Sequence, residues 1–301
     1  MINSITVTNH LGDSITMEMR NPEYSGFLIR SIGGLGPSKA EINKTDISVL
    51  DGSFYNSSRT TSRDIRLELT FLREPSIEAV RLKSYKYFPI EKRVKLEINT
   101  DSREAYVYGY VESNEPNIFS KEEGTVIVIK CMEAYFYSLV DGLVVFSSIT
   151  PVFECPFSNE SLVTKLINMG DIAYETTKNI YYEGDSEVGV VFVIRANGTV
   201  NNLVITKVST GETIELDSSI IIAITGADIS AGDVIVLSTV VGEKYITLTR
   251  SGTVYNIRNA IGKYPEWFKL DRGDNEFSYS ADSGVTNLQF EVSFKIAYEG
   301  V

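Results

Sequence analysis

The sequence is short of the residues on which most enzyme chemistry and most metal sites depend. Its 301 residues include one histidine, His10, and two cysteines, Cys131 and Cys155. Any nucleophilic system that uses histidine would have to use His10. One histidine and two cysteines also supply too few ligands for a structural zinc ion, and two cysteines cannot form a disulfide framework. We therefore expect no catalytic set, no metal and no cofactor.

Long apolar runs are absent as well. No run approaches the roughly 20 residues that a membrane-spanning helix needs, so we expect no membrane insertion. The longest candidate, residues 220–224, is predicted to be a buried strand. The start of the chain, MINSITVTNHLGDS, has neither a basic segment nor a long apolar core, so we expect no signal peptide and synthesis in a cytoplasm.

Positive charge is scarce relative to negative charge. The chain has 28 Lys and Arg residues against 40 Asp and Glu residues, which gives a formal net charge of −12 at pH 7. Because binding to phosphate backbones needs a basic surface, this balance argues against a nucleic-acid-binding protein.

What the chain does contain is typical of β structure. Aromatic residues make up 11% of it and include 17 tyrosines, and such residues favour strands. Residues 65–71 alternate apolar and polar side chains, which predicts a half-buried strand. One helix is expected over residues 76–88, with Ser76 as its N-cap and Pro89 ending it.

The length predicts two domains. The end of the run AYFYS and the turn at Asp141-Gly142 place the boundary within 134–158, and we take it to fall after residue 140. Residues 1–140 form a mixed unit of strands and the one helix, and residues 141–301 follow as nearly all short strands. Turn sequences there recur every ten to fifteen residues, which is typical of a β-sandwich. The alternating strand 288–298 should complete a sheet that 143–149 opens, whereas residues 158–179 fit either a helix or an extended segment.

The stretch 26–63 contains the sequence that looks most specialised for contact. Gly33, Gly34 and Gly36 allow positive φ, and Pro37 fixes its own φ and lacks an N–H. Such a loop suits a backbone that lies close against another surface. Its sequence does not fit a phosphate-binding loop, which needs Gly-Lys-Ser/Thr directly before a helix.

Three other features have a plain and a functional interpretation. Tyr106, Tyr108 and Tyr110 share one strand face, which is either half-buried over the helix or an intersubunit surface. Trp267 is either a core anchor or a platform for a sugar. Acidic residues cluster near two loops. They either form solvated surface or include the paired carboxylates of a glycosidase. The residues are Glu112, Glu115, Glu122, Glu123, Asp185 and Glu187.

Six runs of sequence, spread along the chain in order, resemble a known family. They are SIGGLGPSKAEIN (31–43), DGSFYNSSR (51–59), YKYFPIEKRVKLEINTDSREAYVYGYVESNEPNIFSKEEG (85–124), FECPFSNESL (153–162), YYEGDSEVGVVFVI (181–194) and YEGV (298–301). Together they resemble the distal tail proteins, or Dit proteins, of long-tailed bacteriophages.

The resemblance implies a mainly β protein with two domains. The first, 1–140, would be a β-sandwich or barrel-like belt domain with one helix and a protruding hairpin, and the second, 141–301, a galectin-like or carbohydrate-module-like β-sandwich. Six copies would form a ring at the virion tail tip, between the tail tube protein and the tail-associated hub protein, with receptor-binding proteins as further partners. DNA would pass through the ring without specific binding.

A ring needs two different complementary patches on each copy. We expect these at the glycine loop, at the polar and aromatic residues that follow it, and in a polar loop expected over residues 112–124; alternatively these residues brace the first domain internally. The interface candidates are Gly34, Leu35, Gly36, Pro37, Lys39, Tyr55, Asn56, Arg59, Asn114 and Phe119. The alternative functions are a carbohydrate-binding adhesion module, with Trp267 exposed, and a tail-tip glycoside hydrolase.

Overall fold

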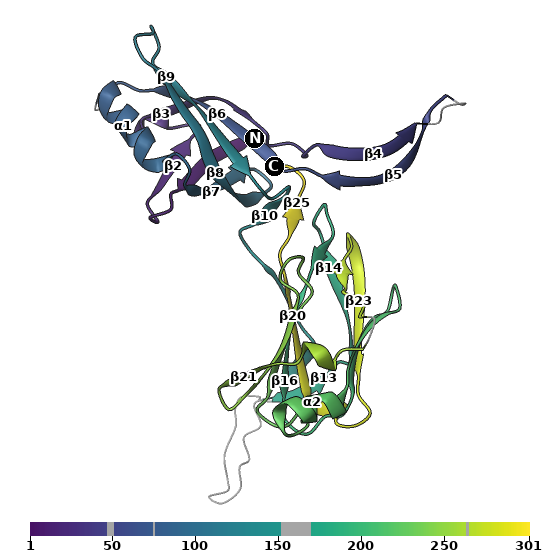
Figure 1. Cartoon of the computed structure of the whole chain (residues 1–301). Helices are drawn as coiled ribbons and strands as arrows, with labels where there is room; N and C mark the ends of the chain where they lie inside the picture. The colour runs from purple at the N-terminus through teal and green to yellow at the C-terminus, as the bar shows by residue number, and fades with distance from the viewer. Residues whose placement is uncertain (47–50, 75, 152–169, 263–264) are drawn as a thin grey trace, which may run out of the picture. The chain divides into compact units, whose positions relative to one another are not determined.

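The computed structural model describes residues 1–46, 51–74, 76–151, 170–262 and 265–301 (Figure 1). These residues group into two compact units, unit 1 with 1–140 and 297–301, and unit 2 with 141–296. The expected second domain, 141–301, therefore differs in its last five residues, which pair with unit 1. No helix in the described part of the chain is long and apolar enough to span a membrane.

Unit 1 is built mainly of antiparallel strands and one α-helix. In chain order its elements are β1 (Ile2–Thr8), β2 (Ser14–Glu18), the 3-10 turn η1 (Pro22–Tyr24), β3 (Phe27–Gly33), β4 (Ala40–Asp46), β5 (Ser53–Thr60), β6 (Arg63–Phe71), α1 (Ile77–Tyr87), β7 (Arg93–Thr100), β8 (Glu104–Asn117), β9 (Gly124–Cys131), β10 (Phe136–Ser138) and β25 (Ala297–Tyr298).

The main sheet of unit 1 has the strand order β2-β1-β7-β8-β9-β6-β3, with β10 attached to β8 and β25 attached to β10. Buried and outward residues alternate along β6 and β9, as the sequence predicts for 65–71: Ile65, Leu67 and Leu69 are buried. β8 continues to Asn117, so the loop expected over 112–124 is shorter than predicted.

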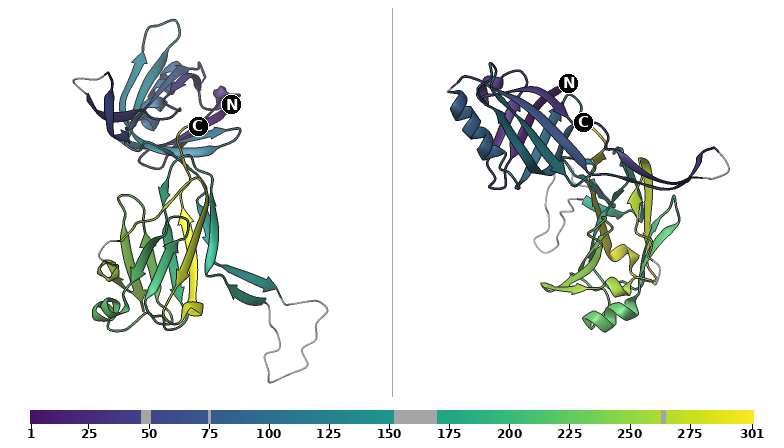
Figure 2. Two further views of the ribbon diagram at one scale, coloured as in Figure 1. Left: turned by 90° about the vertical axis from the view of Figure 1, so that its right-hand side faces the viewer. Right: turned by 45° about the horizontal axis from the view of Figure 1, so that its top comes forward.

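The expected helix is present as α1. Ser76 is its N-cap, and the Ser76 side chain accepts a hydrogen bond from the Ala79 N–H. Val80 and Ser84 are the buried residues of the helix, which lies beside the strands of unit 1 (Figure 2). Val80 is thus the fully buried apolar residue of α1, whereas Leu82 is 56% exposed.

Unit 2 consists of short strands with one α-helix. In chain order its elements are β11 (Gly142–Val145), β12 (Ser147–Pro151), β13 (Gly170–Tyr174), β14 (Thr177–Tyr182), β15 (Val188–Gly189), β16 (Val191–Ala196), β17 (Leu203–Lys207), β18 (Glu212–Leu216), α2 (Ser218–Thr225), β19 (Val234–Ser238), β20 (Tyr245–Arg250), β21 (Thr253–Asn256), η2 (Arg258–Ala260), β22 (Lys269–Leu270), β23 (Gly273–Ser280), η3 (Val285–Asn287) and β24 (Leu288–Phe294).

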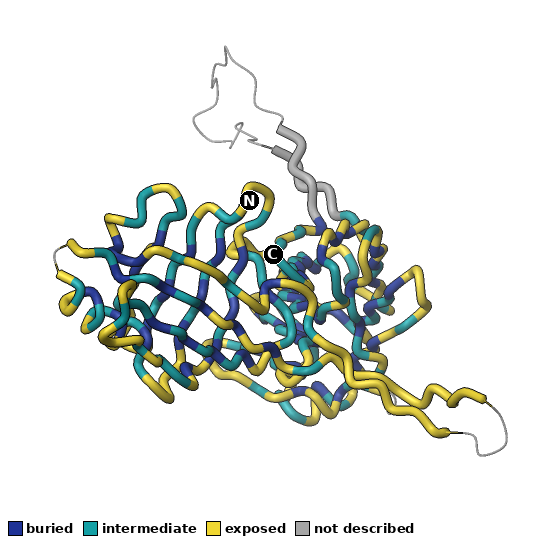
Figure 3. Tube along the Cα trace, turned by 90° about the horizontal axis from the view of Figure 1, so that it is seen from above, coloured by how far each residue is buried: buried dark blue, intermediate teal, exposed yellow. Residues whose placement is uncertain are grey.

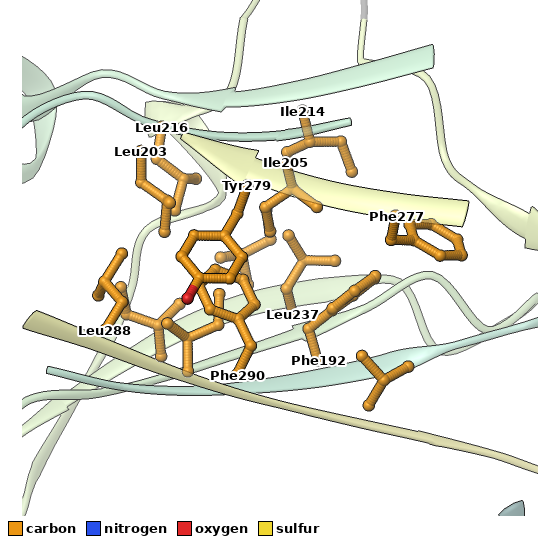
Figure 4. Close-up of a cluster of buried hydrophobic side chains, with 14 of the residues drawn as sticks. Phe192, Leu203, Ile205, Ile214, Leu216, Leu237, Phe277, Tyr279, Leu288 and Phe290 are labelled. Atoms are coloured by element: carbon orange, nitrogen blue, oxygen red, sulfur yellow. The ribbon is translucent and has the colours of Figure 1, made fainter. Parts of the chain in front are cut away.

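Two sheets of unit 2 enclose one apolar core, which makes it a β-sandwich. The six-stranded sheet has the order β11-β24-β16-β19-β20-β21, and the four-stranded sheet has the order β14-β23-β17-β18. Figure 4 shows their side chains meeting in the core. The rings of Tyr279 and Phe290, one from each sheet, stack with centroids 3.9 Å apart, and such aromatic contacts add to the burial of apolar area.

The prediction of a strand over 220–224 is wrong, because these residues lie in α2. The Asp217 side chain caps the helix by accepting from the Ser219 N–H at 2.8 Å, and Gly226 ends it with a left-handed φ of 83°. Caps at both ends outweigh the strand preference of the isoleucines between them.

The expected long final strand is divided. β24 pairs with β11 and so completes the sheet that β11 opens, as predicted. The strand ends at Phe294, and the chain then joins unit 1 as β25. In the segment 158–179, which fitted either a helix or an extended segment, residues 170–174 and 177–179 are in strands. Residues 158–169 lie outside the described residues. Cys155 lies outside them too.

Candidate assembly surface of unit 1

β4 and β5 form a two-stranded ribbon, here called the arm, that projects from unit 1 (Figures 1 and 2). Every residue of both strands is exposed, and Figure 3 shows the arm in the exposed colour along its described length. An isolated two-stranded ribbon is at best marginally stable in water, because neither face is covered. The arm therefore has the properties of an element that is completed by another molecule.

Polar side chains link the two strands of the arm. Arg59 pairs with Glu41 at 2.6 Å, and the Asn56 Nδ2 donates to Thr45 Oγ1 at 2.8 Å. Exposed ion pairs of this kind contribute little to stability. These contacts therefore shape the arm without making it independently stable.

Large apolar side chains of the arm face solvent. Ile42, Phe54 and Tyr55 are 61%, 64% and 66% exposed. The interface candidates Tyr55, Asn56 and Arg59 all lie on β5, whereas Ile42 and Phe54 were not predicted as interface residues. The missed signal was the occurrence of isolated large apolar residues in a run rich in Ser, Thr and Asn.

Arg63, which opens β6 just after the arm, is buried, and its hydrogen bonds to the described residues all go to backbone carbonyls. Its Nε and Nη2 donate to Ala134 O, its Nη1 donates to Gly34 O and Gly36 O at 3.2 Å, and its Nη2 also donates to Glu299 O at 2.8 Å. Burial lowers the pKa of the guanidinium from its usual range. Arg63 thus forms hydrogen bonds both to the glycine loop and to the C-terminal residues.

The C-terminal residues are held at the same place by further contacts. The Val301 N–H donates to Leu35 O at 3.0 Å, and Arg103 donates to Gly300 O at 2.7 Å. The Arg103 guanidinium also lies 4.3 Å from the centre of the Tyr298 ring. The run YEGV therefore forms part of the base of the arm.

For the start of the glycine loop, the structure favours internal bracing over an interface. Gly34 has a φ of +87°, and a Cβ there would lie 2.1 Å from Asp64 O. Leu35 is buried. Gly34 and Gly36 both accept hydrogen bonds from Arg63. The backbone that this loop approaches closely is its own domain.

Pro37 and Lys39 are exposed and lead into the arm. At the other predicted loop, Asn114 is bonded within unit 1: its Oδ1 accepts from Thr125 Oγ1 at 2.6 Å, and its Nδ2 donates to Ser84 O. Phe119 lies beyond the end of β8, is 98% exposed and has a φ of 68°. Phe119 is thus available for contact, whereas Asn114 is a brace.

The three tyrosines of β8 lie on the outward side of the sheet. Tyr106 and Tyr108 are half-buried and Tyr110 is exposed. Cations from β7 cover two of the rings, with Arg93 3.8 Å from the Tyr108 centroid and Lys95 4.7 Å from the Tyr106 centroid. Tyrosine and arginine together are enriched in interface cores.

Trp267 is half-buried in unit 2 and packs against the core. Lys244 and Arg258 lie 5.3 Å and 5.8 Å from its ring. A sugar platform requires a free ring face, so this position fits the core-anchor interpretation better.

The acidic clusters considered for catalysis contain carboxylates that face cations on the surface. The ion pairs are Glu112–Lys130, Glu122–Arg30, Asp185–Arg272 and Glu187–Lys269. A catalytic acid instead needs an environment that raises its pKa. These pairs are typical of solvated surface.

Comparisons with known proteins give matches at the level of structure. No protein-family model and no curated protein matches the sequence. The Dit protein (gp 19.1) of phage SPP1, described as a paradigm of the hub adsorption apparatus of phages that infect Gram-positive bacteria, matches with a TM-score of 0.62 and 10% identity. The match covers 97% of this chain and 98% of that one.

The baseplate of phage p2 in its activated conformation also matches, in structures with strontium and with calcium. The TM-scores are 0.43 and 0.42, at 11% and 12% identity, over 97% of this chain and 97% and 98% of those chains. The SPP1 match shows that this chain has the β-rich fold of a phage Dit protein. That is the fold class implied by the resemblance in sequence.

Proposed function

We propose that this chain is a structural distal tail protein of a siphovirus-like phage or prophage. In this role it forms a hexameric ring at the virion tail tip and joins the tail tube to the adsorption apparatus. The observation that carries the proposal is the SPP1 Dit fold over almost the whole chain. The fold alone does not define a function, so the exposed arm supplies the second argument.

A closed ring is made by a patch on one copy that meets a different patch on the next. The arm is suited to be one such patch, because removing its apolar side chains from water is favourable in free energy. In the proposed ring it lies on the neighbouring copy. Pro37, Lys39 and Phe119 are the other predicted interface residues that remain available for this contact.

The proposed ring contacts the tail tube protein on one side and the tail-associated hub protein on the other, with receptor-binding proteins beyond. Each copy has a formal net charge of −12 at pH 7, so six copies together have 6 × −12 = −72. A like-charged ring lets DNA pass without binding it. The protein is made in the bacterial host cytoplasm before assembly.

Light scattering of the purified chain at several concentrations tests the ring. We expect six chains of 33.5 kDa, or a multiple of six, and a smaller species when Phe54 and Tyr55 are both replaced by serine. A monomer at every concentration would contradict self-assembly of the ring. Binding to a glycan array without assembly would instead support the adhesion module.

A further inference from the structure

Three hydrogen-bond donors of unit 2 come together at Trp267 without an acceptor from the described residues. The Lys244 ammonium lies 5.3 Å and the Arg258 guanidinium 5.8 Å from the centre of the indole ring. Within the described part of the chain, neither cation has an ion pair or a side-chain hydrogen bond, and the indole Nε1 donates to no atom. All three groups can only donate hydrogen bonds.

The other cations of unit 2 show how this place differs. Most of the described cations of the unit pair with a carboxylate: Lys178, Lys207, Arg250, Lys269 and Arg272. In a chain of net charge −12 at pH 7, carboxylates are plentiful. Glu243 and Glu266, next in sequence to Lys244 and Trp267, are exposed and form no ion pair with either cation. Two positive charges at one indole thus remain open to an anion.

The backbone of the sandwich sets the positions of these donors. Lys244 directly precedes β20, and Arg258 opens η2. The Ile257 N–H donates to Ile246 O at 3.0 Å, which holds the two segments side by side. Trp267 packs partly against the core of unit 2. The donors are therefore brought together by the fold itself, which lowers the cost of binding a ligand there.

We propose that this cluster binds a phosphate group, carried by a small ester or free in solution. A phosphate monoester has a charge of about −1.5 to −2 at pH 7 and three strong acceptor oxygens, which match two cations and one neutral N–H. The fork of arginine and the ammonium of lysine are groups that commonly bind phosphate. A carboxylate has one charge, so it would balance only one of the two cations.

This mode of binding does not use the face of the indole as a platform. The ring packs partly against the core, and cation–π attraction holds the side chains of Lys244 and Arg258 beside it. The phosphate is recognised by charge and by hydrogen bonds, one of which comes from the indole N–H. The site lies within unit 2 and does not depend on the proposed ring.

Fluorescence of the full-length chain tests the site, because Trp267 is its only tryptophan. Titration with glycerol 3-phosphate and with inorganic phosphate should each give a saturable change, and the tighter of the two identifies the source of the phosphate group. Glycerol should give no change. Isothermal titration calorimetry gives the dissociation constants independently of the fluorescence.

Charge-neutral variants locate the binding. Lys244→Gln and Arg258→Gln each remove a charge-assisted hydrogen bond and should weaken the binding of glycerol 3-phosphate about tenfold or more. Arg195→Gln is the matched control, since Arg195 on β16 is also exposed and has no ion pair with a described residue. It should leave the dissociation constant unchanged, and far-UV circular dichroism checks that each variant is folded.

Three results would overturn the proposal. The first is the absence of a saturable response to both phosphates in the wild type. The second is an equal loss of affinity in Arg195→Gln, which would show a general attraction of anions to any unpaired cation. The third is tighter binding of a polyglutamate peptide than of glycerol 3-phosphate, which would show that the cluster receives an acidic protein segment.

Discussion

The arm and the sheet from which it projects are both antiparallel β structure, but they are stabilised in different ways. β6 and β9 alternate buried and outward residues, and Leu67 and Ile127 are at most 1% exposed. The arm has the same strand pairing and no buried residue on either strand. Hydrogen bonds between strands are thus common to both, whereas apolar burial belongs to the sheet alone.

This difference indicates which parts of unit 1 are stable within the single chain and which parts are suited to contact another molecule. Net stabilisation comes mainly from apolar burial, and a hydrogen bond adds only about 1 kcal/mol. The base of the arm, around Arg63, belongs to the self-sufficient part. Changes at the base should therefore alter folding, and changes on the arm should alter assembly.

The largest effect is expected for Arg63→Ala. It removes a buried guanidinium together with the donor that it supplies to the carbonyls of Gly34, Gly36 and Glu299, whereas Ala134 O keeps the donor Ser38 Oγ. The free energy of unfolding of unit 1 should therefore fall by about 4 kcal/mol. Far-UV circular dichroism during urea unfolding measures the loss, while Trp267 fluorescence reports unit 2 separately.

The control for this prediction is Arg66→Ala on the same strand. Arg66 is exposed and pairs with Glu68 at 3.4 Å, so its loss should change the free energy of unfolding by less than about 0.5 kcal/mol. Equal effects at the two arginines would contradict the role given to Arg63.

A smaller loss is expected for Gly34→Ala. The new Cβ meets Asp64 O at a positive φ, which should cost about 2–3 kcal/mol in the free energy of unfolding. Gly36→Ala is the matched variant, because no atom lies within 4 Å of a Cβ there. Urea unfolding of both should show a clear loss only at Gly34.

On the arm, the double change Phe54→Ser and Tyr55→Ser should change the free energy of unfolding of the single chain by less than about 0.5 kcal/mol, because both side chains are exposed. The same variant should fail to assemble. Calorimetry and light scattering on one sample give both values, and a large loss of stability would show that the arm packs within its own chain.

The smallest effect on folding is expected for Arg59→Glu. It replaces an exposed ion pair with Glu41 by two like charges, and such surface changes alter stability by a few tenths of a kcal/mol. Assembly should still weaken if the arm lies on a neighbour. If the mass of the assembled species by light scattering is unchanged at low protein concentration, Arg59 is not part of the interface.

Local patterns in the sequence predicted the elements that local rules control. The helix cap at Ser76 and the alternation over 65–71 are signals within a few residues. The helix α2 was missed because its isoleucines favour strands, although Asp217 and Gly226 carried its capping signals. From the sequence alone the final strand was predicted as one strand over 288–298 and not as two, since the return of 297–301 to unit 1 depends on partners far away in the chain.

The candidate site shows the same limit. Tyr55, Asn56, Arg59 and Phe119 were selected as interface candidates, and all four are exposed. The role of Arg63, by contrast, depends on hydrogen bonds to carbonyls up to 236 residues away in sequence. A buried arginine that is held by backbone carbonyls has no sequence pattern. Distant tertiary contacts of this kind become visible only in the folded chain.

The central claim, that a neighbouring copy completes the arm, is tested most directly by hydrogen exchange of the arm amides as the protein concentration is varied. If the claim is right, amides of β4 and β5 are protected only where the chain is assembled, while those of β6 and β9 are protected throughout. Arm amides that are equally protected in the single chain, or that exchange freely in the assembled species, would contradict it.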